Sequence, residues 1–244
     1  MCGRARRRDE DAVRVEPEGL RRDRGINYLF DVPPGIRCQV GEEYIDGVFL
    51  SHAHLGHVTG LLYFGKEAFN ADNVSVHCSA TVHEFLQENP PYRLLLDRGN
   101  IEVDQFEAGD AINVMGLTVR PVEVLNEGYV TTDTNAFVIE TADTRLFYMS
   151  DIDEWTDDAV AAVADADVAI VDGCFWSREE IERYENVPHP PVQESLEILG
   201  DLDTEIYFTH MNHTNPILDP GSPERQQVED AGFHVAEEGM EIEL

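Results

Sequence analysis

The stretch FLSHAHLGHVTGLL, residues 49–62, places three histidines directly behind an apolar run. His52 and His54 are two residues apart, and His57 follows three residues later. Where a chain leaves a strand, imidazoles at these spacings can converge on one ion, and imidazole nitrogen suits zinc and other divalent transition metals. A lone histidine is more often a packed or surface residue, but three in six residues at a strand end favour a metal site.

Two further apolar runs end in a side chain that can bind a metal. Asp151 follows the run in RLFYMSDIDEW, and His210 ends the run in EIYFTH. An aspartate after a strand is commonly a turn or N-cap residue, but beside the histidines the pattern favours Asp151 as a ligand, with Asp153 the weaker candidate. We therefore predict five metal ligands: His52, His54, His57, Asp151 and His210.

The loop after His210, MNHTNP, crowds polar side chains behind a core strand, which is typical of the rim of a site. We predict His213 as a second ligand, a general acid or base, or a hydrogen-bond partner of a ligand. Asn212 and Asn215 are predicted to bind substrate. His189, between prolines in NVPHPP, is interpreted with equal weight as a structural turn residue or as a histidine that reaches the site and moves protons.

The composition is strongly acidic. Asp and Glu number 49 against 17 Lys and Arg, the formal net charge is −32, and Lys66 is the sole lysine. The acids lie between core-type residues, as in EWTDDAVAAVADADVAIVDG, which indicates an acidic folded surface rather than a disordered tail. At very high salt the Debye length is ~3 Å or less and such a surface is screened, so we predict a halophilic protein. The alternative is an acidic partner-binding face, and nucleic-acid binding through a basic surface is not expected.

The sequence also indicates the cellular compartment in which the protein is expected. No apolar run approaches the ~18 residues of a membrane span, and the start MCGRARRRDEDAVRV has no apolar segment behind its basic residues, as a secretory signal would. We therefore expect a cytoplasmic protein, in a high-salt cytoplasm, with no membrane partner. The four cysteines form no C-x-x-C pair and are expected to be buried or free thiols in a reducing compartment.

The order of the predicted elements indicates the fold class. Residues 1–24 lack periodicity and are interpreted as an irregular, disordered or mis-started lead-in, and residues 25–244 as a single domain. Apolar or alternating runs predict strands at NYLFDV, IDGVFLSH, VSVHCS, IEVDQFE, AINVMGLTVRPVEV, NAFVIET, RLFYMSD, DVAIVDG, EIYFTH and FHVAEEGMEIEL. Helices are predicted at VTGLLYFGKEAF, ATVHEFLQENP (stopped by Pro90), DDAVAAVADA, VQESLEILGDL and ERQQVEDAG. Strands in runs, then alternating with helices, predict a layered α/β (α+β) fold.

Taken together, HAHLGH at residues 52–57, Asp151 and His210 resemble the metallo-β-lactamase superfamily. Its pattern is H-x-H-x-D-H, an isolated third histidine, a bridging aspartate and a final histidine. The blocks YLFDVPPGIR, YMSDIDEW, VDGCFWS, VPHPPVQESLEIL and FTHMNHTNP run in order between residues 28 and 218 and resemble the subgroup of the pyrroloquinoline quinone biosynthesis protein B (PqqB). The resemblance implies a four-layer αββα sandwich with a metal site at one edge and, as is frequent in the superfamily, a homodimer.

The sequence departs from that pattern at two positions. Gly56 stands where the aspartate for a second ion belongs, and the segment expected to carry the third histidine, VEVLNEGYVTTDT, contains none. Glu127 is the favoured substitute ligand, with Asn126 as the alternative. The remaining donors are His52, His54 and Asp151 for one position, and His57, Asp151 and His210 for the other. We predict one or two divalent ions, zinc first and iron or manganese as alternatives, in a mononuclear or weakly dinuclear site.

Three functions remain open. The leading hypothesis is a metal-dependent hydrolase whose metal-bound hydroxide attacks a small-molecule ester, thioester or phosphodiester. The second is an iron-dependent oxygenase or cofactor-biosynthesis protein, because two histidines and a carboxylate are the ligand set of iron(II) oxygenases and because the resemblance to PqqB implies oxidation of a tyrosine-derived precursor. The third is a non-catalytic descendant that binds a metal or another ligand. Fold alone does not choose between them.

Overall fold

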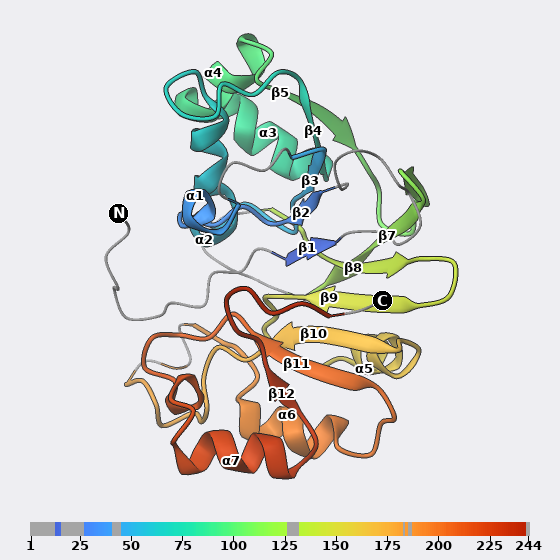
Figure 1. Ribbon diagram of the computed structural model, residues 1–244, viewed down its shortest axis with the longest axis vertical. Coiled ribbons are helices and arrows are strands. Elements are labelled where there is room, and N and C mark those ends of the chain that lie inside the picture. The colour runs from blue at the N-terminus through green and yellow to red at the C-terminus, as the bar shows by residue number, and fades with distance from the viewer. Residues whose placement is uncertain are drawn as a thin grey trace. The chain divides into compact units, whose positions relative to one another are not determined.

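The computed structural model describes residues 13–15, 27–40, 45–125, 132–182, 184 and 187–242 (Figure 1). The chain divides into two compact units. The N-terminal unit takes in residues 10–123 and 127–135, and the C-terminal unit is built mainly from residues 136–244, with 124–126. The two predicted groups of metal ligands fall in different units.

The N-terminal unit is built on a five-stranded sheet in the order β1-β2-β3-β4-β5. β1 is antiparallel to β2, and β2 to β5 are all parallel. β2 and β3 are buried throughout, which explains why both read as continuous apolar runs. The strands are Val13–Val15 (β1), Tyr28–Phe30 (β2), Gly47–Phe49 (β3), Val74–Cys78 (β4) and Ile101–Gln105 (β5).

Helices cover the hydrophobic core of this sheet. Core side chains from β3, β4, the 3₁₀ segment and α3, among them Val48, Leu61, Val76 and Leu86, form one buried cluster. Ser79 caps α3 by accepting a hydrogen bond from the backbone N–H of Val82 at 3.3 Å. The helices are Ile36–Gln39 (α1), Leu55–Val58 (α2), Thr59–Phe64 (η1, 3₁₀), Ala80–Glu88 (α3) and Pro90–Asp97 (α4).

A hairpin completes the N-terminal unit. β6 (Ile112–Val114) and β7 (Leu117–Val124) are antiparallel and are joined by Met115 and Gly116. Both loop residues have positive φ, 47° and 95°. Two-residue hairpin loops favour this backbone because its twist matches that of the flanking strands.

The C-terminal unit contains a run of mainly parallel strands in the order β12-β11-β10-β9-β8. β9 to β12 are parallel, and β8 is antiparallel to β9. The strands are Thr134–Glu140 (β8), Arg145–Met149 (β9), Val168–Asp172 (β10), Glu205–Thr209 (β11) and His234–Val235 (β12). Because parallel strands all end at one edge, residues that follow β9, β10 and β11 meet there.

Helices and strands alternate in this unit, and Figure 1 shows α6 and α7 lying along β11 and β12. The helices are Asp157–Ala164 (α5), Val192–Leu199 (α6), Pro216–Leu218 (η3, 3₁₀) and Pro223–Asp230 (α7). Thr156 caps α5 and Ser222 caps α7, each accepting from a backbone N–H three residues on. Polar caps therefore set where α5 and α7 begin.

The predicted α/β class is confirmed, and most predicted strands and helices lie where expected. Two local predictions were wrong. Residues 58–69 are not one helix, because Val58 ends α2 and residues 59–64 form the 3₁₀ helix η1, and the C-terminal strands reduce to β12 in the described residues. The helix expected to stop at Pro90 does end before it, but Pro90 also starts α4, which was not predicted. β1 lies within residues 1–24, where no regular element was expected. Within the described ranges no helix is long and apolar enough to span a membrane.

Candidate metal centre

The three histidines of HAHLGH gather at the carboxyl end of β3, in the N-terminal unit. The ring of His52 lies 4.4 Å from that of His54 and 4.2 Å from that of His57, measured between centroids. His52 and His54 each offer a ring nitrogen within 4.8 Å of the other. His52 and His57 are buried, whereas His54 is half-buried and precedes the first turn of α2. We name these three residues the histidine cluster.

A buried aspartate that the sequence analysis did not single out supports the histidine cluster. Asp31 follows β2, is fully buried, and has a φ of 62°, which is unusual for a residue other than glycine. Its carboxylate accepts hydrogen bonds from the Ser51 backbone N–H at 2.8 Å and from His57 Nδ1 at 2.9 Å. The Ser51 hydroxyl also donates to Asp31, at 2.8 and 2.9 Å to its two oxygens.

These hydrogen bonds fix the orientation of two imidazoles. Since the one hydroxyl proton of Ser51 is used on Asp31, the 2.8 Å contact between Ser51 Oγ and His52 must be donated by His52 Nδ1. His57 Nδ1 donates to Asp31 directly. Both rings therefore present Nε2 as the nitrogen for a metal, the arrangement in which a carboxylate behind a histidine orients it as a ligand.

Charge explains why Asp31 stays ionised in this position. Burial alone would raise the pKa of Asp31, but the charge of His57, its hydrogen bond, the charge of His52 and the Ser51 N–H together lower the pKa below its ordinary value. Asp31 is therefore a fixed negative charge behind the imidazoles.

Gly56 leaves open space beside this cluster. A Cβ placed on Gly56 would meet no heavy atom within 4 Å. The carboxylate expected there in a complete dinuclear motif is therefore missing, and no other described side chain fills its place. The histidine cluster is a set of imidazoles with no carboxylate facing it from α2.

The C-terminal unit holds a second donor group, which we name the aspartate–histidine cluster: Asp151, Asp172, His189 and His210. One ligand atom from each residue lies within 4.8 Å of the others. Asp151 comes two residues after β9, Asp172 ends β10 and His210 directly follows β11, so adjacent parallel strands deliver three of the four. His189 comes from the loop before α6. The structure thus brings Asp151, His210 and His189 together.

Asp172 holds the aspartate–histidine cluster in place. It is fully buried and accepts from His189 Nδ1 at 2.7 Å, from the Cys174 N–H at 2.8 Å and from the Ile152 N–H at 3.1 Å. Burial alone would raise the pKa of Asp172, but the charge and hydrogen bond of His189, followed by His210, lower it. Burial opposes protonation of His189, yet Asp172 raises the pKa of His189 to about 11.

His210 and Asp151 complete the second cluster. His210 Nε2 lies 4.0 Å from Asp151 Oδ2, and His210 Nδ1 lies 3.8 Å from Asp172 Oδ1. The His210 backbone has a φ of 60°, a conformation that costs energy outside glycine and is concentrated at functional sites. Asp151 Oδ1 also lies 3.5 Å from His189 Nδ1. The donors are close enough to close around an ion with small side-chain movements.

The remaining predicted site residues lie in different environments. His213 is exposed, and its Nδ1 is 3.1 Å from Asn212 Oδ1. Asn215 is buried, its amide donates to the Gly173 carbonyl at 2.8 Å, and its oxygen accepts from the Ile217 N–H at 3.1 Å, so it braces the loop after β11. Their roles in catalysis and substrate binding stay predictions. Glu127, the predicted substitute ligand, and Asn126 lie outside the described residues.

Three site residues were missed in the sequence: Asp31, Asp172 and Cys174. The signal for the aspartates was available, since each ends an apolar strand just as Asp151 does. Cys174 was taken as an ordinary thiol, and its sequence context carries no ligand spacing. Only the fold brings it to His189 and His210, within 4.8 Å of a nitrogen of each.

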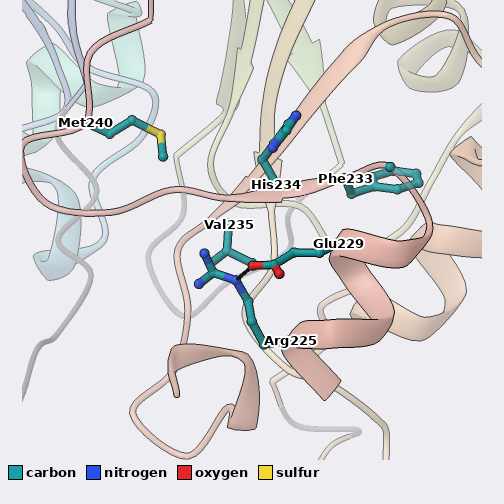
Figure 2. A pocket seen from close by; sticks show the side chains of 7 residues that line it. Arg225, Glu229, Phe233, His234, Val235 and Met240 are labelled. Atoms are coloured by element: carbon teal, nitrogen blue, oxygen red, sulfur yellow. Dashed lines mark hydrogen bonds and ion pairs between the residues drawn. The ribbon is translucent and has the colours of Figure 1, made fainter. Parts of the chain in front are cut away.

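A cavity of about 280 Å³ lies apart from both clusters' residues, at β12 and α7 (Figure 2). It is lined by Arg225, Glu229, Gly232, Phe233, His234, Val235 and Met240. The guanidinium of Arg225 is paired with Glu229 at 2.7 Å and with Glu237 at 3.3 Å. Its charge is therefore compensated within the fold, and this cavity offers no obvious anion site.

Comparison with known families identifies the class of protein. A family model described as "Beta-lactamase superfamily domain" matches residues 27–211, and the chain belongs to this family. The superfamily expected from HAHLGH, Asp151 and His210 is thereby confirmed.

The relatives are more specific. The chain is similar to the "Coenzyme PQQ synthesis protein B" of Nitrosococcus oceani, with 29% identity over 232 residues that cover 82% of this chain and 74% of the relative. The protein of the same name from Azotobacter vinelandii is 26% identical over 261 residues, covering 91% and 85%. The expected PqqB-like relationship is thus confirmed at the level of homologous sequences.

Solved structures agree on the fold. The zinc-bound PqqB from Methylobacterium extorquens matches with a TM-score of 0.83 at 22% identity, covering 96% of this chain and 87% of the other. A diphosphatase of the PhnP family matches with a TM-score of 0.71 at 20% identity, covering 96% and 83%. These likenesses confirm the α/β metallo-β-lactamase fold, consistent with the predicted layered sandwich.

The donor chemistry of this chain fits the divalent metal that the fold implies. In each cluster a fully buried aspartate accepts a hydrogen bond from a histidine Nδ1, which is how metal-ligating histidines are commonly held. The aspartate–histidine cluster adds carboxylate oxygens to imidazole nitrogens. Such nitrogen and oxygen sets bind zinc, iron(II) or manganese(II).

Proposed function

We propose that this protein is a metal-dependent hydrolase that takes its metal ligands from His52, His54, His57, Asp151 and His210. The observation that carries the proposal is the aspartate–histidine cluster, where two buried carboxylates and two imidazoles offer ligand atoms within 4.8 Å of one another. A divalent ion bound by such a set, zinc first and iron or manganese as alternatives, lowers the pKa of a bound water toward ~7 and polarises the scissile group. The substrate class is a small-molecule ester, thioester or phosphodiester.

The protein's own residues position and move protons in this proposal. Asp172 holds the His189 ring through Nδ1 and leaves Nε2 to serve as a ligand or to carry a proton. His213 is exposed on the loop that follows β11 and is the candidate to protonate a leaving group. Asn212, beside it, is the candidate to orient substrate.

Metal analysis followed by a hydrolysis panel tests the proposal. The protein is purified in molar potassium chloride, stripped of metal and reloaded with zinc, manganese or iron(II), then assayed on a phosphodiester, an oxygen ester and a thioester. We expect one class to be cleaved in a metal-dependent manner, and His210→Ala to abolish cleavage. His234→Ala, an exposed histidine on β12, is the control that should leave activity unchanged. A metal-loaded protein that cleaves none of the three classes would contradict the proposal and leave a non-catalytic metal-binding protein.

A second candidate function is an iron-dependent oxygenase or cofactor-biosynthesis protein like PqqB. The observation that favours it is the name shared by the relatives, whose similarity extends over 82% and 91% of this chain. Two histidines and one carboxylate with open coordination positions also suit iron(II). Iron copurifying with the protein, together with oxygen consumption on a tyrosine-containing peptide and no hydrolysis, would favour this function over the first.

We also propose that the protein works in a high-salt cytoplasm. The support is the net charge of −32 and the single lysine, a surface whose self-repulsion weakens when salt screens it. Thermal unfolding should occur at higher temperature as potassium chloride rises from 0.1 M to molar concentration. A midpoint that does not change, or that falls, would support the alternative of an acidic partner-binding face.

A further inference from the structure

Cys174 is fixed next to the two histidines of the aspartate–histidine cluster. It is buried, its N–H donates to Asp172 at 2.8 Å, and its carbonyl accepts from the Asn212 N–H at 2.9 Å. The preceding residue, Gly173, packs so closely on β11 that an added Cβ would lie 2.8 Å from the Cβ of Phe208. The turn that carries Cys174 is therefore held against the start of the loop that carries His210.

The thiol of Cys174 and the imidazoles of His189 and His210 form a further donor group, which shares its two histidines with the aspartate–histidine cluster. The sulfur of Cys174 and one nitrogen each of His189 and His210 lie within 4.8 Å of one another. The three residues come from three segments, the ends of β10 and β11 and the loop before α6. Zinc binds sulfur at ~2.3 Å and nitrogen at ~2.0–2.1 Å, so groups this close need only small side-chain movements to bind one ion together.

We propose that Cys174 is a metal ligand, and that with His189 and His210 it forms a site selective for zinc and other thiophilic divalent ions. This proposal rests on the metal-binding part of the proposed function and adds a ligand that the superfamily pattern H-x-H-x-D-H, His, Asp, His does not contain. Thiolate sulfur favours zinc over hard ions such as manganese, which prefer carboxylate and water. Asp151 and Asp172, which share the same two histidines, offer the hard alternative.

The other described cysteines provide matched controls. Cys78 is buried in the core of the N-terminal unit, where burial, followed by the charge of Asp133, raises the pKa of its thiol to about 12. Cys38 is exposed at α1. Neither belongs to a donor group among the described residues. Serine at either position should leave metal binding unchanged.

Cobalt(II) substitution tests the proposal directly. Cobalt bound by a thiolate gives an intense near-ultraviolet charge-transfer absorption, whereas cobalt bound only by nitrogen and oxygen does not. We expect this absorption in the full-length protein and in Cys38→Ser and Cys78→Ser, and its loss in Cys174→Ser. Zinc affinity should fall more than ~10-fold in Cys174→Ser, since loss of even an indirect partner costs ~10–100-fold, while manganese affinity should change little.

X-ray absorption of the zinc-loaded wild-type protein covers the case in which Cys174→Ser fails to fold. A sulfur neighbour at ~2.3 Å supports the proposal, and a shell of nitrogen and oxygen alone overturns it. Persistence of the charge-transfer band in Cys174→Ser would also overturn it. If the protein binds metal without sulfur, only the thiolate ligand is wrong; if it binds no zinc or cobalt at all, the proposed function fails as well.

Discussion

The two clusters hold a histidine in the same way, through a buried aspartate, but they differ in the other donors that surround it. In each unit a fully buried aspartate stands at the carboxyl end of a parallel strand, Asp31 after β2 and Asp172 at the end of β10. Each accepts from at least one backbone N–H and from one histidine Nδ1, His57 or His189. Carboxyl ends of parallel strands gather such side chains because the strands point to one edge.

What differs is the charge that faces an ion. The histidine cluster has three imidazoles, and the carboxylate that its own unit supplies to them, Asp31, lies behind them, while Gly56 leaves open space where α2 could carry another. The aspartate–histidine cluster has two carboxylates beside its two histidines, and the thiol of Cys174 lies near the same histidines. The described donors of the C-terminal cluster therefore carry negative charge that can balance a divalent cation, whereas the three histidines of the N-terminal cluster offer neutral nitrogen donors.

Removing either buried aspartate should have the largest effect on stability. Asp31→Ala leaves the Ser51 N–H and His57 without their acceptor, and Asp172→Ala does the same to the Cys174 N–H and His189. Breaking one partner of a buried ionic pair costs ~3–5 kcal/mol. Urea unfolding should show a loss of that size for both variants. If the free energy of unfolding falls by less than ~1 kcal/mol in one variant, the two aspartates do not stabilise their units equally.

Ligand substitutions measure how unequal the two clusters are in metal binding. We expect His210→Ala to lower zinc affinity more than His54→Ala, because His210 lies within 4.0 Å of two carboxylates of its own unit, while the ring next to His54 in its own unit is the imidazole of His52. Each loss should reach at least ~10-fold. The double variant tests whether both residues serve one ion, since groups that act together show coupling of ~0.5–3 kcal/mol. Unchanged metal content in His54→Ala would remove His54 from the ligand set.

Restoring the carboxylate at Gly56 should make the clusters more alike. Gly56→Asp places its side chain where a Cβ meets nothing within 4 Å, so the fold should tolerate it. The number of ions bound per chain, measured by calorimetric titration and elemental analysis, should rise. Gly56→Asn has the same shape without the charge and should leave the number unchanged. An equal rise in both variants would mean that the added side chain, not its charge, changes the site.

The fold was largely predictable because its determinants are local. Buried parallel strands such as β10 read as continuous apolar runs, and α5 follows a threonine cap. The helix α4 was not predicted, for a local reason. A proline stops the helix before it, as α3 does stop, but proline is also favoured in the first turn of a helix, and here Pro90 opens α4 directly after α3.

The site was predictable only in part. His52, His54, Asp151 and His210 could be predicted as ligands because each is polar and follows an apolar run, a pattern visible along the chain. The aspartates that hold the neighbouring histidines are set by strand order: Asp31 reaches His57 from 26 residues away, and Asp172 reaches His189 from 17. Cys174 joins His210 in the same way. No spacing in the sequence encodes these approaches, which depend on which strands lie side by side.

The smallest expected effect concerns His77, which belongs to neither cluster. It lies near the end of β4, the strand that pairs with β3. His77 is buried and stacks on Phe49 with ring centroids 4.5 Å apart. Burial lowers the pKa of His77, and Asp104, 4.0 Å away and exposed, only partly opposes this.

The sign of the pH dependence of His77 follows from proton binding. In the unfolded chain this histidine binds a proton near pH ~6.5, whereas in the folded chain its lowered pKa means that it is protonated only at lower pH. The free energy of unfolding therefore falls as the pH drops below ~6.5 and levels off below the folded pKa. His77→Phe keeps the stacked ring and removes the proton site. Urea unfolding should therefore show that the free energy of unfolding falls less between pH 7.5 and pH 5.5 in His77→Phe than in wild type. If it falls equally in both, the pH dependence belongs to other groups, first of all the buried histidines of the two clusters.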